Sequence, residues 1–177
     1  QQDLYMRPTI YKSDLGIGVR LHDLKDEFCM FVMAYEPYVK NDTNAHVTIS
    51  SWRRIDDNVI PARGKVAGAY ANSALIKTDA NRAGFDEAIV LDNHGHVSEG
   101  SAMNIFMLRD GVLVTPPITD NILEGITRRS IIEVARKELG IEIVERSIDR
   151  TEVFIAEEMF MTGTAAQVVA ITKVDHR

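Results

Sequence analysis

The fold class is decided by the stretch Asn104-Ile105-Phe106-Met107-Leu108-Arg109-Asp110-Gly111-Val112-Leu113-Val114-Thr115. Its β-branched and apolar residues predict strands over 104–109 and 112–115. Asp110-Gly111 between them is a strong signal for a two-residue hairpin turn. The chain is therefore expected to contain an antiparallel sheet.

A helix is predicted downstream over residues 127–139, where the apolar side chains fall on one helical face and Gly140 is placed to end the helix. Further strands are expected over 4–11, 28–35, 46–52, 87–92, 159–161 and 168–174. A helix rich in small residues is expected over 65–82. Asp149 and Glu152 resemble an N-cap pair before a short helix that reaches Ala156. Strands outnumber helices and do not alternate strictly with them, which favours an α+β fold over a parallel doubly wound sheet.

Composition excludes several classes of protein. The 177 residues are 45% hydrophobic, carry a formal net charge of -6 and contain no run of basic residues, so nucleic-acid binding is disfavoured. The longest apolar run, around Cys29, is far too short to span a membrane. Cys29 is the single cysteine, which excludes an internal disulfide and suggests a buried, reduced thiol. A cytoplasmic location is the default expectation.

Metal and nucleotide motifs are missing from the sequence. Only His94 and His96 lie close together among the five histidines, and they flank Gly95 in a predicted turn. No Cys/His cluster has zinc spacing, and there is no Walker, Gly-x-Gly-x-x-Gly or Gly-x-Ser-x-Gly motif. We therefore expect no metal site.

Two segments carry a candidate functional side chain each. In the first, residues 60–70, small and apolar neighbours favour partial desolvation of Lys65, which would lower the pKa of its amine; a solvated surface lysine is the alternative. In the second, residues 97–106, Glu99 stands between a short strand and an apolar one. From the sequence alone, Glu99 is better explained as a turn residue than as a buried anion.

Two further segments are candidate anion sites. Residues 123–129 place Arg128 and Arg129 in the first turn of the predicted helix, against its dipole. A bound anion would resolve that conflict, and so would pairing with Asp120 or Glu124. Residues 162–166, Thr-Gly-Thr-Ala-Ala, follow a strand and could hold an anion through backbone N–H groups and the Thr164 hydroxyl, although a tight structural turn is the default interpretation.

Taken in order, the segments Lys65-x-x-x-x-Tyr70, Ser98-Glu99-Gly100, 124–128 (Glu-Gly-Ile-Thr-Arg) and 163–166 (Gly-Thr-Ala-Ala) resemble the fold-type IV pyridoxal-phosphate enzymes, most closely the branched-chain amino acid aminotransferases. The resemblance implies two domains, the larger with a mixed or antiparallel, barrel-like sheet and flanking helices. Residues 1–39 would be the end of a small N-terminal domain, the polar stretch 40–46 a linker, and 47–177 the large cofactor-binding domain. The chain is expected to be a piece of a longer protein that lacks an N-terminal part and a C-terminal end.

The resemblance also implies a role for individual residues. Lys65 would bind pyridoxal 5'-phosphate covalently and move the proton. Tyr70 would contact the phenolic oxygen of the cofactor, and Glu99 its pyridine nitrogen. The remaining positions would hold the cofactor ring (Leu123), its phosphate (Ile126, Thr127, Thr164), the substrate carboxylate (Ala165, Ala166) and the substrate side chain (Arg7, Tyr38).

The implied reaction is transamination of leucine, isoleucine or valine with 2-oxoglutarate by a homodimer or a larger homo-oligomer. D-amino acid transamination, aminodeoxychorismate lyase chemistry and an inactive fragment that keeps the fold stay open as alternatives. Met103, Gln167 and Val169-Ala170 depart from the family pattern near the expected pocket, so they bear on the substrate range.

Overall fold

The computed structural model describes residues 2–177, which form ten strands, two α-helices and three 3-10 turns. The chain divides into two compact units, Gln1–Glu36 and Pro37–Arg177. In the first unit, β1 (Leu4–Lys12) and β2 (Asp26–Ala34) form an antiparallel pair. Most of the apolar side chains of β2 are exposed and Cys29 is only partly buried, so the predicted buried thiol is wrong. Two strands alone cannot enclose a core.

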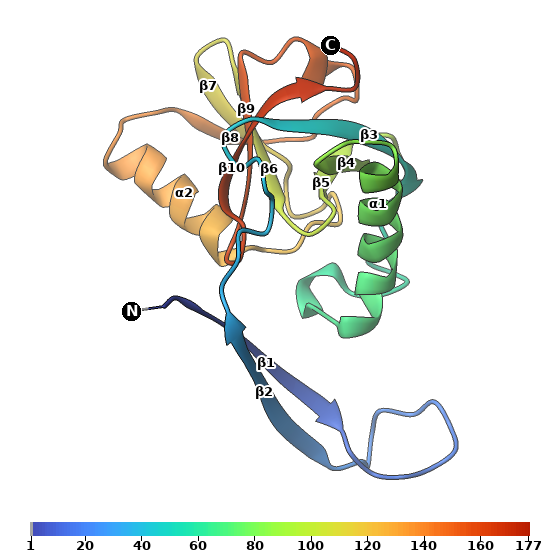
Figure 1. The fold of residues 1–177 in the computed structure, drawn as a ribbon. Coiled ribbons are helices and arrows are strands. Elements are labelled where there is room, and N and C mark those ends of the chain that lie inside the picture. Colours follow the sequence, from blue (N-terminus) through green and yellow to red (C-terminus); the bar gives the residue numbers. More distant parts are fainter. Residues whose placement is uncertain (1) are drawn as a thin grey trace. The chain divides into compact units, whose positions relative to one another are not determined.

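The second unit is built on one eight-stranded mixed sheet (Figure 1). The strands lie in the order β5-β4-β3-β10-β9-β6-β7-β8, and only the pairs β3–β4, β3–β10 and β7–β8 are parallel. Their bounds are β3 (Ala45–Arg53), β4 (Glu87–Leu91), β5 (Val97–Gly100), β6 (Asn104–Arg109), β7 (Val112–Thr115), β8 (Ile143–Glu145), β9 (Glu158–Gly163) and β10 (Gln167–Val174). The predicted hairpin is confirmed, with Asp110 and Gly111 both at positive φ in its turn.

The main core lies on one face of this sheet, where Val47, Ile89, Ile105, Met161 and Val169 are fully or almost fully buried. The two α-helices pack on separate strands: α1 (Tyr70–Arg82) on β3 and β4, and α2 (Ile126–Lys137) on β8 and β9 (Figure 1). Each helix closes a smaller apolar cluster, around Ile76 under α1 and around Phe106 under α2. The helix predicted over 127–139 is thus confirmed within two residues at either end.

Two predicted helices differ from the structure. The helix expected from residue 65 begins only at Tyr70; residues Ala62–Gly64 and Ala67–Ala69 form 3-10 turns, because Lys65 adopts a left-handed backbone (φ 46°) that a helix cannot continue. The helix expected after Asp149 is a single 3-10 turn, Glu152–Phe154. There the Glu152 carboxylate accepts hydrogen bonds from Arg146 instead of capping the turn.

None of the helices formed by residues 2–177 is long and apolar enough to cross a membrane. The same residues contain no group of three His, Cys, Asp or Glu side chains that could hold a metal ion.

Candidate active site

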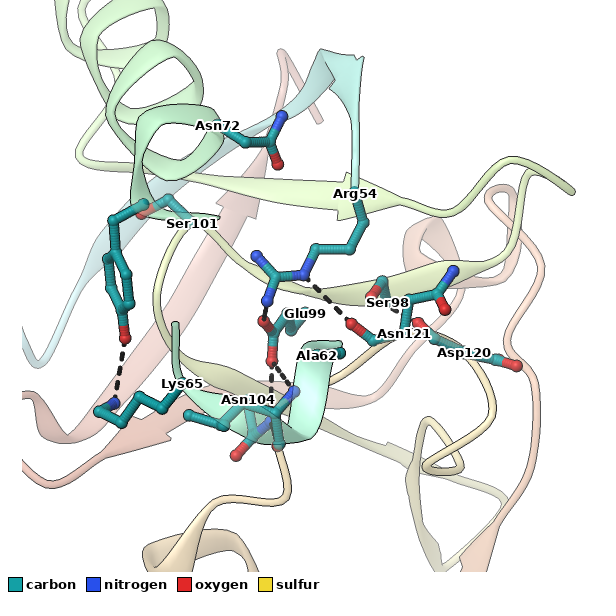
Figure 2. A network of polar contacts seen from close by, with 12 residues as sticks. Arg54, Ala62, Lys65, Asn72, Ser98, Glu99, Ser101, Asn104, Asp120 and Asn121 are labelled. Carbon is teal, nitrogen blue, oxygen red and sulfur yellow. Dashed lines mark hydrogen bonds and ion pairs between the residues drawn. The ribbon is translucent and has the colours of Figure 1, made fainter. Parts of the chain in front are cut away.

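Glu99 is the buried centre of the site. It lies in β5 and is 3% exposed, so the interpretation of Glu99 as a turn residue is wrong. Its Oε1 is 2.8 Å from a guanidinium nitrogen of Arg54, and its Oε2 accepts hydrogen bonds from the Asn104 side-chain amide and the Leu123 backbone N–H, both at 3.0 Å. Figure 2 shows Arg54 and Asn104 reaching this carboxylate from opposite sides. Three donors therefore fix the orientation of the carboxylate.

Burial raises the pKa of Glu99 to about 7. The positive charges of Arg54, Lys65 and Arg128 and the hydrogen bond from the Leu123 N–H oppose this rise, because each favours the ionised form. Lys65 is thus one of the positive charges that lower the pKa of Glu99. The carboxyl group can therefore hold or release a proton near neutral pH.

Lys65 and Tyr70 form a second pair at the entrance to α1. The Lys65 Nζ donates a hydrogen bond to the Tyr70 hydroxyl at 3.0 Å, and both side chains are exposed. The expected partial desolvation of Lys65 is therefore wrong, because Lys65 lies on a loop before the helix and not within it. The left-handed backbone of Lys65 is a sparsely populated conformation for a non-glycine residue, and such conformations concentrate at functional sites.

The start of α2 lies beside the same carboxylate. The Asn104 amide that donates to Glu99 also donates to the Leu123 carbonyl at 2.8 Å, two residues before the N-cap Gly125. A Cβ on Gly125 would lie 2.1 Å from Asn104 Oδ1, so only glycine permits this approach. The helix has no side-chain cap and no acidic residue in its first turn. The backbone N–H groups of Ile126 and Thr127 thus form an electropositive end.

Arg128 pairs differently from the surface pairing that the sequence suggested. Arg128 is buried and donates to the Pro116 carbonyl at 2.9 Å and to Glu145 at 2.8 Å, rather than to Asp120 or Glu124. Arg129 is exposed. Glu124 pairs instead with Arg63 at 2.7 Å. The strand β8, which supplies Glu145, was not predicted, so this partner could not be found in the sequence.

The loop between β9 and β10 carries the three remaining candidates of this unit. Thr164 is exposed, Ala165 is half-buried and Ala166 is buried. The strand register pairs Thr162 with Asn104, and a Cβ on Gly163 would lie 3.8 Å from the Ala102 carbonyl. The loop thus begins beside the strand end that carries Asn104.

The two candidates for the substrate side-chain pocket lie in different units. Arg7 is an exposed residue of β1, and its guanidinium lies 5.5 Å from the centre of the Tyr5 ring. Tyr38 belongs to the second unit, and the Lys77 ammonium lies 5.4 Å from the centre of its ring. Neither contact joins these residues to Glu99.

Sequence reasoning missed two residues that contact Glu99, Arg54 and Asn104. Arg54 follows directly after β3 and looks like one of a pair of surface arginines, yet it is only 9% exposed. Asn104 opens the strand 104–109 and looks like an ordinary boundary residue. Their role depends on tertiary packing, which no local pattern in the sequence signals.

Comparison with known proteins agrees with this geometry. The model of the family described as amino-transferase class IV matches residues 1–174, and the chain belongs to this family. It is 45% identical over 177 residues to a probable branched-chain-amino-acid aminotransferase of Aquifex aeolicus and 39% identical over 175 residues to the branched-chain-amino-acid aminotransferase of Escherichia coli. The matches cover 100% and 97% of this chain but only 57% and 56% of those relatives, so the chain spans little more than half their length.

Solved structures show the same relationship. The chain is similar to the branched-chain aminotransferase of Thermoproteus uzoniensis solved with norvaline, with a TM-score of 0.94 and 40% identity over 98% of this chain and 58% of that one. The branched-chain amino acid aminotransferase of Thermobaculum terrenum in its PLP form gives a TM-score of 0.91 and 36% identity over 98% and 56%. The chain therefore has the fold of the fold-type IV aminotransferases, and its relatives are branched-chain aminotransferases.

Proposed function

We propose that this chain carries the cofactor site of a pyridoxal 5'-phosphate-dependent aminotransferase that converts branched-chain L-amino acids and 2-oxoglutarate into branched-chain 2-oxo acids and glutamate. The observation that carries the proposal is the buried Glu99 carboxylate, which is held by Arg54 and Asn104 and whose pKa is lowered by the charge of Lys65, the hydrogen-bond partner of Tyr70. The similarity to branched-chain aminotransferases supports the choice of substrate. The family resemblance supports a homo-oligomer and the division into domains at residues 40–46.

The donor set fits the cofactor at both of its ends. An aromatic ring nitrogen that must stay protonated is stabilised by an anion, and Glu99 is a buried carboxylate with no second carboxylate bonded to it. A phosphate dianion is stabilised by backbone N–H groups at a helix start, and the first turn of α2 has no side-chain cap and no acidic residue. We assign the phosphate to Ile126, Thr127 and Thr164 and the face of the ring to Leu123.

The bound cofactor supplies an electron sink that makes the amino acid α-proton removable. Lys65 would hold the cofactor covalently, and its Nζ as a free amine would accept the proton and return it. Tyr70 orients that Nζ through its hydroxyl. The positive charge of Arg54 opposes the rise in the Glu99 pKa and so favours the charged form of this carboxylate. In this proposal the substrate carboxylate would meet the backbone near Ala165 and Ala166, and the resemblance keeps Arg7 and Tyr38 as candidates for binding the substrate side chain.

The proposal is tested by loading the chain with pyridoxal 5'-phosphate, reducing with borohydride and locating the pyridoxyl group by peptide mass spectrometry. We expect the group on Lys65 and its loss in Lys65→Ala. Lys137→Ala is the matched control, since Lys137 forms only an exposed pair with Glu133. An adduct spread over several lysines, or none, would refute the site.

Transamination is measured in parallel with leucine and 2-oxoglutarate. Glutamate formation that is lost in Lys65→Ala supports the assigned reaction. Turnover of D-alanine alone would identify a D-amino acid aminotransferase instead. A specific Lys65 adduct without any turnover would show a chain that binds the cofactor but does not catalyse the reaction.

A further inference from the structure

Two loops of the second unit meet at Asn121. One loop leads from Arg54, just after β3, to the turn that ends at Lys65. The other runs from β7 to α2 and contains Leu123. Asn121 has a φ of 60°, a left-handed conformation that asparagine tolerates better than most residues because its short polar side chain can bond locally.

Asn121 contacts the first loop through both of its oxygen atoms. Its backbone carbonyl accepts a hydrogen bond from Arg54 Nε at 3.1 Å, and its side-chain Oδ1 accepts the backbone N–H of Asp57 at 3.2 Å. Figure 2 shows the contact between Arg54 and Asn121 beside the Arg54–Glu99 pair. One residue therefore holds the first loop at two points.

Each contact leads to a different part of the site. Arg54 contacts both Asn121 and Glu99. Its Nε donates to the Asn121 carbonyl, and a terminal guanidinium nitrogen pairs with the Glu99 carboxylate. Asp57 accepts the backbone N–H of Ala62 at 3.0 Å, and Ala62 is the buried first residue of the 3-10 turn that ends at Lys65. Asn121 is thus connected to Glu99 through Arg54 and to the turn before Lys65 through Asp57.

The remaining link between the loops is weaker. Arg63 bridges Glu124 at 2.7 Å and Asp57 at 3.6 Å, but all three side chains are nearly half exposed. Exposed ion pairs contribute little because water and salt screen them. The partly buried hydrogen bonds of Asn121 therefore contribute more than these ion pairs to holding the two loops in place.

We propose that Asn121 is a positioning residue that sets the placement of Lys65 relative to Glu99. This inference rests on the proposed function, since it assigns a purpose to the spacing of those two groups. Asparagine meets both requirements of the position. Glycine would keep the left-handed backbone but lose the side-chain acceptor, and alanine would lose the acceptor and strain the backbone.

The test titrates the Glu99 carboxyl carbon by NMR in the protein without cofactor. The charged groups that act on Glu99 are Arg54, Lys65 and Arg128. Asn121→Gly releases Asp57 and loosens the turn before Lys65, which weakens the influence of the lysine; the pKa of Glu99 is expected to rise by at least about 0.5 unit. Asn121→Ala also turns away the carbonyl that holds Arg54, so a larger rise is expected.

Asn58→Gly is the matched control, because Asn58 lies in the same loop, is exposed and bonds only to Asp56. Its Glu99 titration should equal that of the wild type. Asn121→Gly is the decisive variant, since glycine accepts the native backbone conformation and the fold is retained. An unchanged Glu99 pKa in Asn121→Gly, with or without a lower thermal midpoint, overturns the inference and leaves Asn121 a merely structural residue.

The rate at which pyridoxal 5'-phosphate forms a borohydride-fixed adduct on Lys65 is the second measurement. We expect a severalfold decrease in both Asn121 variants and none in Asn58→Gly. The two proposals can fail separately: a wild-type chain without a Lys65 adduct refutes the function, whereas the Glu99 titration tests the positioning by Asn121 without any cofactor.

Discussion

The position of the Lys65 amine depends on an unusual backbone conformation of this residue. The residue adopts φ 46° and ψ 40°, which costs an L-residue with a Cβ roughly 1 kcal/mol and costs glycine almost nothing. The chain keeps a lysine at a position that local stability would assign to glycine. Such a choice is expected where the side chain is needed for function.

This strain gives a prediction that needs no cofactor. Lys65→Gly and Lys65→Ala both remove the hydrogen bond to Tyr70, but only glycine relieves the backbone. We expect the glycine variant to be more stable than the alanine variant by about 1 kcal/mol, measured by urea unfolding. Equal stability would show that the left-handed conformation at Lys65 is not strained.

Glu99 makes stability depend on pH. Its pKa is raised from 4.5 to about 7 in the folded state, so the folded chain binds this proton more tightly than the unfolded chain. The stabilisation of the folded state by this proton is complete below pH 4.5 and is lost as the pH rises toward 7. Above that pH it no longer changes. Glu99→Gln removes this dependence.

We therefore compare the unfolding free energies of wild type and Glu99→Gln at pH 5 and pH 8. The wild type should lose about 2 kcal/mol more than the variant over this interval. Glu138→Gln, at the exposed end of α2, is the control and should follow the wild type. Parallel pH profiles for wild type and Glu99→Gln would contradict the raised pKa.

At the scale of elements, the entry into α2 is shaped by one close contact. Gly125 stands at the N-cap, where an added Cβ would overlap Asn104 Oδ1 at 2.1 Å. Gly125→Ala must push Asn104 away from Glu99 or move the start of the helix. We expect a loss of about 1–3 kcal/mol in urea unfolding together with a changed Glu99 titration.

Gly68→Ala is the control for that substitution. Gly68 lies in the 3-10 turn before α1, nothing lies within 4 Å of its Cβ position, and its φ is not positive. The variant should be neutral or slightly stabilising, because alanine restricts the unfolded chain. A loss at Gly68 as large as that at Gly125 would mean that the contact with Asn104 is not the cause.

The elements that the sequence predicts well are those fixed by neighbouring residues. The strands 104–109 and 112–115 follow from the Asp110-Gly111 turn, and α2 follows from its apolar spacing. The helix expected from residue 65 fails because a single left-handed residue, Lys65, stops it, and composition does not reveal that conformation. Local chemistry thus predicts most elements, but it does not predict the start of a helix where one residue leaves the helical conformation.

For the whole molecule, the candidate site follows from the family resemblance, and only part of it follows from the properties of the residues themselves. The motifs locate Lys65, Tyr70 and Glu99, but the burial of Glu99 and its pairing with Arg54 arise where β5, the end of β3 and the approach to α2 come together. Asn121 is placed by the same meeting of distant segments. Positions of this kind have no periodic signature, since their partners lie far away in the sequence.

The order of strands has a consequence for how the protein is made. β10 is the last described strand in sequence order, yet it lies between β3 and β9, and among residues 2–177 it alone joins the group β5-β4-β3 to the group β9-β6-β7-β8. Until residues 167–174 have left the ribosome, β3 and β9 each have an edge without its β10 partner. Synthesis of these eight residues is therefore the step that joins the two groups of strands into one sheet.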